Sequence, residues 1–96
     1  MGKRFDNERA KALAQCILSL ETEQECFDFL EDICTVKEME DLTQRLEVAQ
    51  LLMKHKKYQD IAKETGASTA TISRVNRTLM YGNDGYETVL KRIKRI

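Results

Sequence analysis

An all-α fold is predicted by three features of the sequence. Apolar residues recur at intervals of three or four along most of the chain, and no segment alternates apolar and polar residues for long enough to indicate a strand. Two Thr-x-x-Glu sequences, which typically close the N-terminal end of a helix, begin at Thr22 and Thr35. The 96 residues include 42% hydrophobic side chains and carry no net charge, which favours one compact domain over residues 1–96 rather than a disordered chain.

The N-terminal third is expected to form two amphipathic helices. The first covers residues 6–20, with Leu13 and Ile17 in its apolar stripe. The second begins at a capping box in which the Thr22 hydroxyl accepts a hydrogen bond from the Glu25 amide, while the Glu25 carboxylate reaches back to the amide of the cap residue. Its apolar side chains are expected to form an anchoring core face: Cys26, Phe27, Phe29, Leu30 and Ile33.

A second capping box, Thr35-Val36-Lys37-Glu38, predicts that a third and longer helix starts almost without a linker. Apolar residues keep the helical spacing from Met39 to Met53, so this helix should extend to about Lys54 and form a spine for its neighbours. The short basic sequence Lys54-His55-Lys56-Lys57 is expected to break it.

Residues 58–80 have the pattern of a helix-turn-helix. Two short helices that cross at about a right angle need a small side chain where they touch, and Ala62 supplies one. Gly66 can adopt the positive φ that ends the first helix, and Ser68 can cap the second. Three apolar side chains are placed to hold the pair against the core: Ile61, Ile72 and Val75.

The outer residues of the second helix have side chains that suit DNA. Short hydroxyl- and methyl-bearing side chains at a helix N-terminus can approach base edges, and arginine can pair with guanine or hold a phosphate. No acidic residue occurs between Thr65 and Asn83. We therefore expect residues 68–80 to enter the major groove of double-stranded DNA. The predicted DNA-binding residues are Lys57, Tyr58, Gln59, Lys63, Ser68, Thr69, Ala70, Thr71, Ser73, Arg74 and Arg77.

Two other interpretations of this helix pair stay open. An Ala-x-x-x-Gly pair can be a plain corner between helices, and helix-turn-helix units also bind proteins. Salt separates the second alternative from DNA binding, because contacts of lysine and arginine with phosphate weaken steeply as salt rises, whereas an apolar interface does not.

The zero net charge hides an asymmetry between the two halves of the chain. Residues 1–42 carry 5 basic and 11 acidic side chains, a net charge of −6, and residues 43–96 carry 11 basic and 5 acidic, a net charge of +6. This pattern permits a C-terminal half that binds a polyanion, and equally a dimer in which acidic and basic halves meet. With His55 as the only histidine, no nucleophile beside a base and no glycine-rich phosphate loop, the sequence predicts neither catalysis nor a cofactor.

The three cysteines, Cys16, Cys26 and Cys34, are interpreted as reduced thiols of the core. They lack Cys-x-x-Cys spacing, so a zinc site shared with His55 has no ligand pairing to support it and no metal is expected. No apolar run reaches the length of a membrane span, and residues 1–6 lead into no signal-peptide core. The expected location is the cytoplasm.

The last segment has a turn signal, Asn83-Asp84-Gly85, followed by a predicted helix over residues 86–96. Its apolar positions face away from four basic ones, which would suit a membrane surface. Because only about three turns are available and no tryptophan anchors them, packing against a dimer partner is favoured. The apolar positions are Val89, Leu90, Ile93 and Ile96, and the basic ones are Lys91, Arg92, Lys94 and Arg95.

With these elements in order, the chain resembles the Trp repressor, and more closely the YerC/YecD family of Trp-repressor-related proteins. The resemblance covers nearly the whole chain and is sharpest in LTQRLEVA (residues 42–49) and TGASTATISRV (residues 65–75). It implies six helices, an intertwined homodimer formed by the N-terminal helices, and a bacterial-type transcription regulator, expected to be a repressor, that binds palindromic DNA half-sites about one helical turn apart.

The resemblance also implies a candidate effector site. Trp repressor holds tryptophan between two arginines and a backbone group, and Arg45, Arg74 and Thr35 stand at or near the matching places. The stretch between the two arginines is about one residue shorter here, and Val75 replaces a glycine, so its β-branched side chain is expected to crowd an indole. Tryptophan is therefore not favoured as the effector, and another small molecule, or none, stays open.

Overall fold

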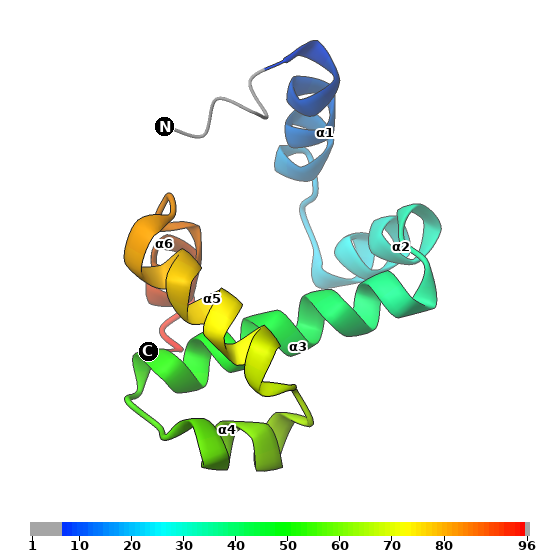
Figure 1. Cartoon of the computed structure of the whole chain (residues 1–96). Helices are drawn as coiled ribbons and strands as arrows, with labels where there is room; N and C mark the ends of the chain where they lie inside the picture. Colours follow the sequence, from blue (N-terminus) through cyan, green and yellow to red (C-terminus); the bar gives the residue numbers. More distant parts are fainter. Residues whose placement is uncertain (1–6, 96) are drawn as a thin grey trace. The chain divides into compact units, whose positions relative to one another are not determined.

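The computed structural model describes residues 7–95, and over this range the chain is helical with no strand. The helices are α1 (Glu8–Leu18), α2 (Glu23–Ile33), α3 (Val36–Met53), α4 (Tyr58–Thr65), α5 (Thr69–Tyr81) and α6 (Gly85–Arg92) (Figure 1). The predicted six-helix, all-α fold is confirmed. The chain divides into two compact units, an N-terminal unit (Met1–Met39) and a C-terminal unit (Glu40–Ile96), with the boundary in the first turn of α3.

The predicted first and last helices are longer than the observed ones. The predicted start at Asp6 lies outside the described residues, and α1 is capped by Asn7, whose side chain accepts a hydrogen bond from the Ala10 amide at 2.8 Å. The Ser19 hydroxyl donates to the Cys16 carbonyl at 2.7 Å and α1 ends there rather than at Leu20. Helix α6 ends at Arg92, and Ile96 lies outside the described residues.

Both predicted capping boxes cap the N-terminus of a helix, but only one forms both of the predicted hydrogen bonds. The Thr35 amide donates to Glu38 Oε1 at 2.8 Å, and the Glu38 amide donates to Thr35 Oγ1 at 3.1 Å, so α3 begins with a reciprocal pair. At α2 the Glu25 amide donates to Thr22 Oγ1 at 3.0 Å. The Glu25 carboxylate, however, accepts from the amide of Glu21 at 2.8 Å, one residue before the predicted donor.

In the N-terminal unit, α1 and α2 bury no residue at all. Their predicted apolar faces exist, but they meet solvent: Ile17 is 52% exposed and Phe27 49%. The cysteines are free, yet Cys16 is exposed and the other two are half-buried, so the prediction of core thiols was wrong for this single chain. Each of the two helices thus has an amphipathic stripe without a buried residue.

The C-terminal unit contains a packed core between α3, α4 and α5. Leu90 of α6 is also buried, at 1% exposure. The core includes each of the three side chains that were predicted to hold the helix pair, and Ala62 packs against it. Its buried members are Val48, Ala49, Ile61, Ala67, Ile72 and Val75.

None of the helices formed by the described residues is both long and apolar enough to cross a membrane.

Candidate nucleic-acid interface

Helices α4 and α5 form the predicted helix-turn-helix. Gly66 ends α4 in the left-handed conformation, with φ at 73°, and its amide donates to the Ala62 carbonyl at 2.9 Å. Ser68 is extended and caps α5, because its Oγ accepts from the Thr71 amide at 3.1 Å. Gly66 and Ser68 therefore end α4 and begin α5 as predicted, and a three-residue turn joins the two helices.

Side chains that the sequence argument missed hold this turn against the spine helix. Gln44 Nε2 of α3 donates to the Thr65 carbonyl at 3.2 Å. The Thr65 hydroxyl donates to the Ile61 carbonyl at 2.7 Å and accepts from the Ala67 amide at 3.1 Å. Ala67 is only 5% exposed. Nothing in the local pattern of α3 marked Gln44 for this contact, because its neighbours one turn away include Glu40, Asp41 and Glu47.

The predicted recognition residues divide into two groups in the structure. The exposed group comprises Ser68, Thr69, Ala70, Arg74 and Arg77. Thr71 and Ser73 are half-buried, and the hydroxyl groups of Ser68 and Thr71 lie 3.1 Å apart in a hydrogen bond. Because the cap already occupies these two hydroxyls, Thr69, Ala70 and Arg74 are better placed to approach a ligand than Thr71.

The predicted phosphate contacts lie at the start and on the surface of α4. Lys57, Tyr58, Gln59 and Lys63 are all exposed, and Lys57 is the N-cap residue but makes no side-chain cap bond. The first amides of α4 are therefore open to an anion. Between residues 54 and 77, no lysine or arginine forms an ion pair with a carboxylate of the described residues.

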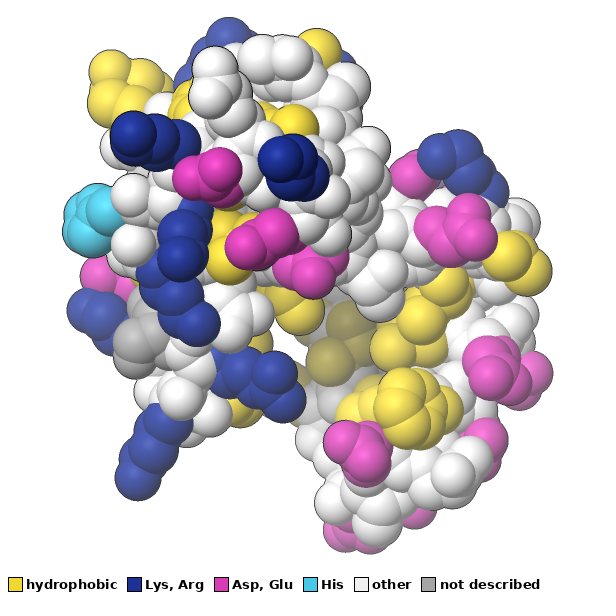
Figure 2. Space-filling view, turned by 90° about the horizontal axis from the view of Figure 1, so that it is seen from below, with side chains coloured by type: hydrophobic (Ala, Val, Ile, Leu, Met, Phe, Trp, Pro, Cys, Tyr) yellow, Lys and Arg dark blue, Asp and Glu magenta, His cyan; other side chains and the backbone are white. Residues whose placement is uncertain are grey.

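Figure 2 views the molecule from the side on which α4 lies in Figure 1. Lysine and arginine side chains gather over the C-terminal unit, interrupted by a few acidic ones, whereas acidic side chains predominate on the visible face of the N-terminal unit. The charge asymmetry of the sequence therefore follows the division into units, and the basic unit is the one that carries the helix-turn-helix.

Two of the three candidate effector residues are brought together. Arg45 and Arg74 line a hollow of about 140 Å³ with Asp41, Gln44 and Thr71. Ligand pockets usually have volumes of about 300–1,000 Å³, so this hollow is small for an indole. Thr35 belongs to the N-terminal unit and does not line it.

The predicted effect of Val75 on that site stays a prediction. Val75 is 2% exposed and belongs to the core, and it is not among the residues that line the hollow between the arginines. The side chain after Arg74 turns inward because it falls on the apolar stripe of α5, so it secures the recognition helix, as the sequence predicted.

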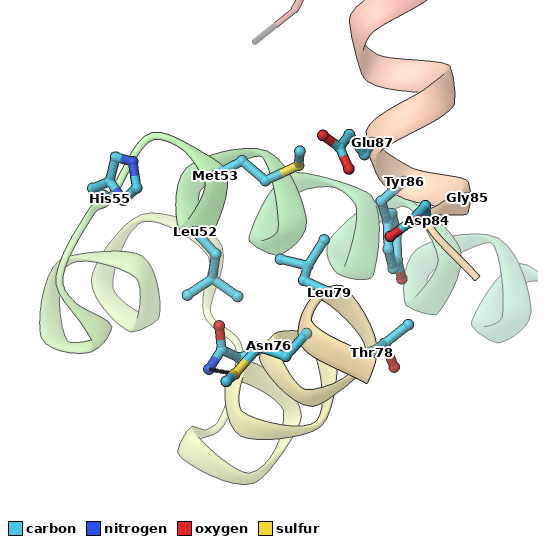
Figure 3. Close-up of a pocket in the computed structure, with 11 residues that line it drawn as sticks. Leu52, Met53, His55, Asn76, Thr78, Leu79, Asp84, Gly85, Tyr86 and Glu87 are labelled. Carbon is cyan, nitrogen blue, oxygen red and sulfur yellow. Dashed lines mark hydrogen bonds between the residues drawn. The ribbon is translucent and has the colours of Figure 1, made fainter. Parts of the chain in front are cut away.

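A larger hollow of about 380 Å³ lies where the end of α3, the second half of α5 and the start of α6 meet (Figure 3). Leu52 and Leu79 point toward one another across it, and Asn76 Nδ2 donates to Met80 Sδ at 3.7 Å. No buried side-chain nitrogen or oxygen of the described residues lacks a partner, so this hollow does not reveal a ligand by its polar groups. No group of three or more metal-ligating side chains was found within residues 7–95.

Comparison with known proteins agrees with this architecture. A model of the Trp repressor protein family matches residues 8–94. The uncharacterized protein YerC of Bacillus subtilis is 52% identical over 94 residues, which is 95% of this chain and 90% of YerC.

Two crystal structures superpose with a TM-score of 0.92. A TrpR-like protein from Eubacterium eligens is 52% identical, with 97% of this chain and 96% of that chain covered. A protein from Staphylococcus aureus is 43% identical, with 100% of this chain and 97% of that chain covered. Since the family model spans α1 to α6 and the helix-turn-helix lies within it, the chain belongs to the Trp repressor family.

Proposed function

We propose that this protein is a sequence-specific DNA-binding transcription regulator that acts through α4 and α5. The observation that carries the proposal is the outer face of α5. Its first turn is capped and presents short side chains, Arg74 and Arg77 are exposed and unpaired, and no carboxylate occurs between Thr65 and Asn83. The Trp repressor family is a regulatory family, which supports the same function and gives no reason to assign catalysis.

In this proposal α5 enters the major groove with its N-terminal half toward the bases. Thr69 and Ala70 offer methyl groups to thymine, and Arg74 can donate two hydrogen bonds to a guanine edge. Lys57 and the open first amides of α4 hold a phosphate on one side of the groove, while Lys63 and Arg77 add positive charge. Tyr58, Gln59, Ser68, Thr71 and Ser73 complete the proposed contact surface.

We further propose that the protein is a homodimer. Helices α1 and α2 bury no residue, and their apolar side chains would remain in contact with water unless a second copy covered them. Helix-turn-helix dimers, among them Trp repressor, bind half-sites about 34 Å apart. The operator should therefore be a palindrome with two half-sites separated by one turn of DNA.

We propose that the regulator is a cytoplasmic repressor. Its candidate site for a small-molecule effector is the hollow between Arg45 and Arg74. The hollow between Arg45 and Arg74 suits a small anionic group better than tryptophan, because it offers two guanidinium groups in about 140 Å³. Thr35 joins the proposed site only if the assembled dimer brings it there.

The test is selection of duplex DNA from a random pool by the full-length protein, at two salt concentrations, with the oligomeric state measured in the same buffer. Enrichment of a palindrome by a dimer, with affinity that falls steeply as salt rises, is the expected result. An unenriched pool whose weak retention does not depend on salt would refute DNA recognition and favour a protein-binding role for the same helix pair.

A further inference from the structure

Two helices of the C-terminal unit end at a residue that adopts an unfavourable backbone conformation. Helix α3 is followed by His55 with φ at 64°, and α6 by Lys94 with φ at 59°. In each case an amide reaches back five residues, from Lys56 to the Leu51 carbonyl at 3.1 Å and from Arg95 to the Leu90 carbonyl at 2.9 Å. These are the hydrogen bonds of a Schellman motif.

Glycine is the usual residue at that position because it has no Cβ to clash in the left-handed conformation. Helix α4 follows this preference with Gly66, whose φ is 73°. Lysine, unlike asparagine or aspartate, has no short polar side chain that can hydrogen-bond locally in the left-handed conformation. The Lys94 side chain therefore does not stabilise this helix end. An outlier of this kind is a reason to look for a role of the side chain itself.

The two helix ends lie beside the same part of α3. Gln50 Nε2 donates to the Arg95 carbonyl at 3.1 Å, which ties the end of α6 to α3. Lys54 follows Gln50 by four residues and so lies one turn further along the same face. In Figure 1 the segment that follows α6, up to residue 95, runs toward the C-terminal end of α3.

Five cations at these ends are exposed and form no ion pair within residues 7–95: Lys54, Lys56, Arg92, Lys94 and Arg95. We call them the end strip. Acidic side chains border it, because Glu40 and Glu47 line a hollow with Arg95, and Asp84 and Glu87 line one with His55. Among the described lysines and arginines of α6 and its end, only Lys91 has a carboxylate partner, Glu87 at 2.8 Å.

We propose that the end strip is a second phosphate-binding surface, which contacts the backbone of duplex DNA outside the segment read by α5. This inference rests on the proposed function. The choice of duplex DNA follows from continuity, because Lys56 is adjacent in the chain to Lys57, the N-cap of α4, where the proposed recognition surface begins. Positively charged side chains beside a groove-binding helix can contact the phosphates of DNA that continues past the half-site.

The experiment measures how the association constant for duplex DNA depends on salt, for the full chain and for Lys54→Gln and Lys94→Gly variants. The slope of log K against log salt is negative, and each lost phosphate contact should reduce its magnitude by about 0.9. Sequence preference should not change, since phosphates carry no base identity. Lys94→Gly should not lower the melting temperature, because glycine removes the steric conflict, so weaker binding by this variant cannot be attributed to unfolding.

Lys91→Gln is the matched control, because it removes a cation of the same helix that is already paired, and its slope should equal that of the wild type. An unchanged slope in both end-strip variants, while the wild type still selects an operator, would overturn this inference alone. Failure of the wild type to bind any duplex would overturn the proposed function with it. Loss of binding to anionic vesicles in the variants, with DNA binding intact, would instead assign the strip to a membrane surface and refute the DNA contact.

Discussion

The two units of this chain have similar helical patterning and opposite degrees of burial. In the N-terminal unit α1 and α2 bury nothing, and Leu18 is 83% exposed. In the C-terminal unit six apolar residues form a buried core, and Leu90 is 1% exposed. The comparison teaches that an amphipathic stripe specifies a helix and the face it will bury, but not the partner that buries it.

The largest expected effect comes from the core of the C-terminal unit. Ile61→Ala removes a fully buried side chain and should lower the free energy of unfolding by about 2–5 kcal/mol. The loss should not depend on protein concentration, because the partners of Ile61 belong to the same chain. Chemical denaturation at several concentrations measures this, and Glu64→Ala, at an exposed position of α4, serves as the control.

Ile17→Asp in α1 should dissociate the proposed dimer. Ile17 is 52% exposed in the single chain, and a carboxylate at a covered position must lose its hydration. We expect the dimer Kd to rise by about 100-fold, or about 2.7 kcal/mol, measured by analytical ultracentrifugation. Gln15→Asp, on the same helix and exposed, is the control, and equal dissociation by both variants would contradict a specific interface.

Tight packing in the C-terminal unit can be tested at two glycines. A Cβ on Gly82 would lie 2.5 Å from the Thr78 carbonyl oxygen, which already accepts the Gly82 amide at 2.8 Å. Gly82→Ala should therefore cost about 1–3 kcal/mol of stability. Gly85→Ala meets nothing within 4 Å and should be nearly neutral, so equal melting temperatures for the two variants would count against this turn.

Arg74→Ala tests whether function belongs to the C-terminal unit. Arg74 is exposed and should be removable without loss of helical content, while DNA binding weakens by about 1–3 kcal/mol and preference at one base position relaxes. Arg9→Ala in α1 removes an equally exposed arginine from the other unit and should leave operator affinity unchanged. Circular dichroism and a binding titration measure the two properties.

The smallest expected effect compares one ion pair in each unit. Lys91 donates to Glu87 at 2.8 Å, and this hydrogen bond, with the attraction of the carboxylate, raises the pKa of Lys91 above its ordinary 10.5. A raised lysine pKa stabilises the fold below pH 10.5 and loses that contribution as the pH rises through the raised value. Lys91→Gln should thus lower the melting temperature slightly at pH 7. At a pH above the raised pKa of Lys91, the substitution should have no such effect. Lys11→Gln, whose partner Glu8 is 3.6 Å away, should change it even less.

Most of the local structure follows from short-range chemistry in the sequence. Gly66 in its left-handed conformation and Ser68 as a cap were predictable because each acts on the amides within three or four residues. The reciprocal bonds between Thr35 and Glu38 were predictable for the same reason. The end of α1 was predicted two residues too late and that of α6 four residues too late, because helix ends depend on competing local bonds.

Several features of the candidate site depend on residues far apart in the chain and were not predicted. The bond from Gln44 to the Thr65 carbonyl joins positions 21 residues apart, and that from Gln50 to the Arg95 carbonyl joins positions 45 apart.

By itself the sequence determined which segments are helices, where the helix-turn-helix begins and ends, and that Thr69, Ala70, Arg74 and Arg77 of α5 face outward, because periodicity and capping act over one or two turns. Only the tertiary structure decided that Arg45 and Arg74 share one small hollow, that Thr65 and Ala67 secure the turn, and that no described residue of α1 or α2 is buried. The physical reason is that burial is a property of three-dimensional neighbours, which a pattern along the chain does not contain.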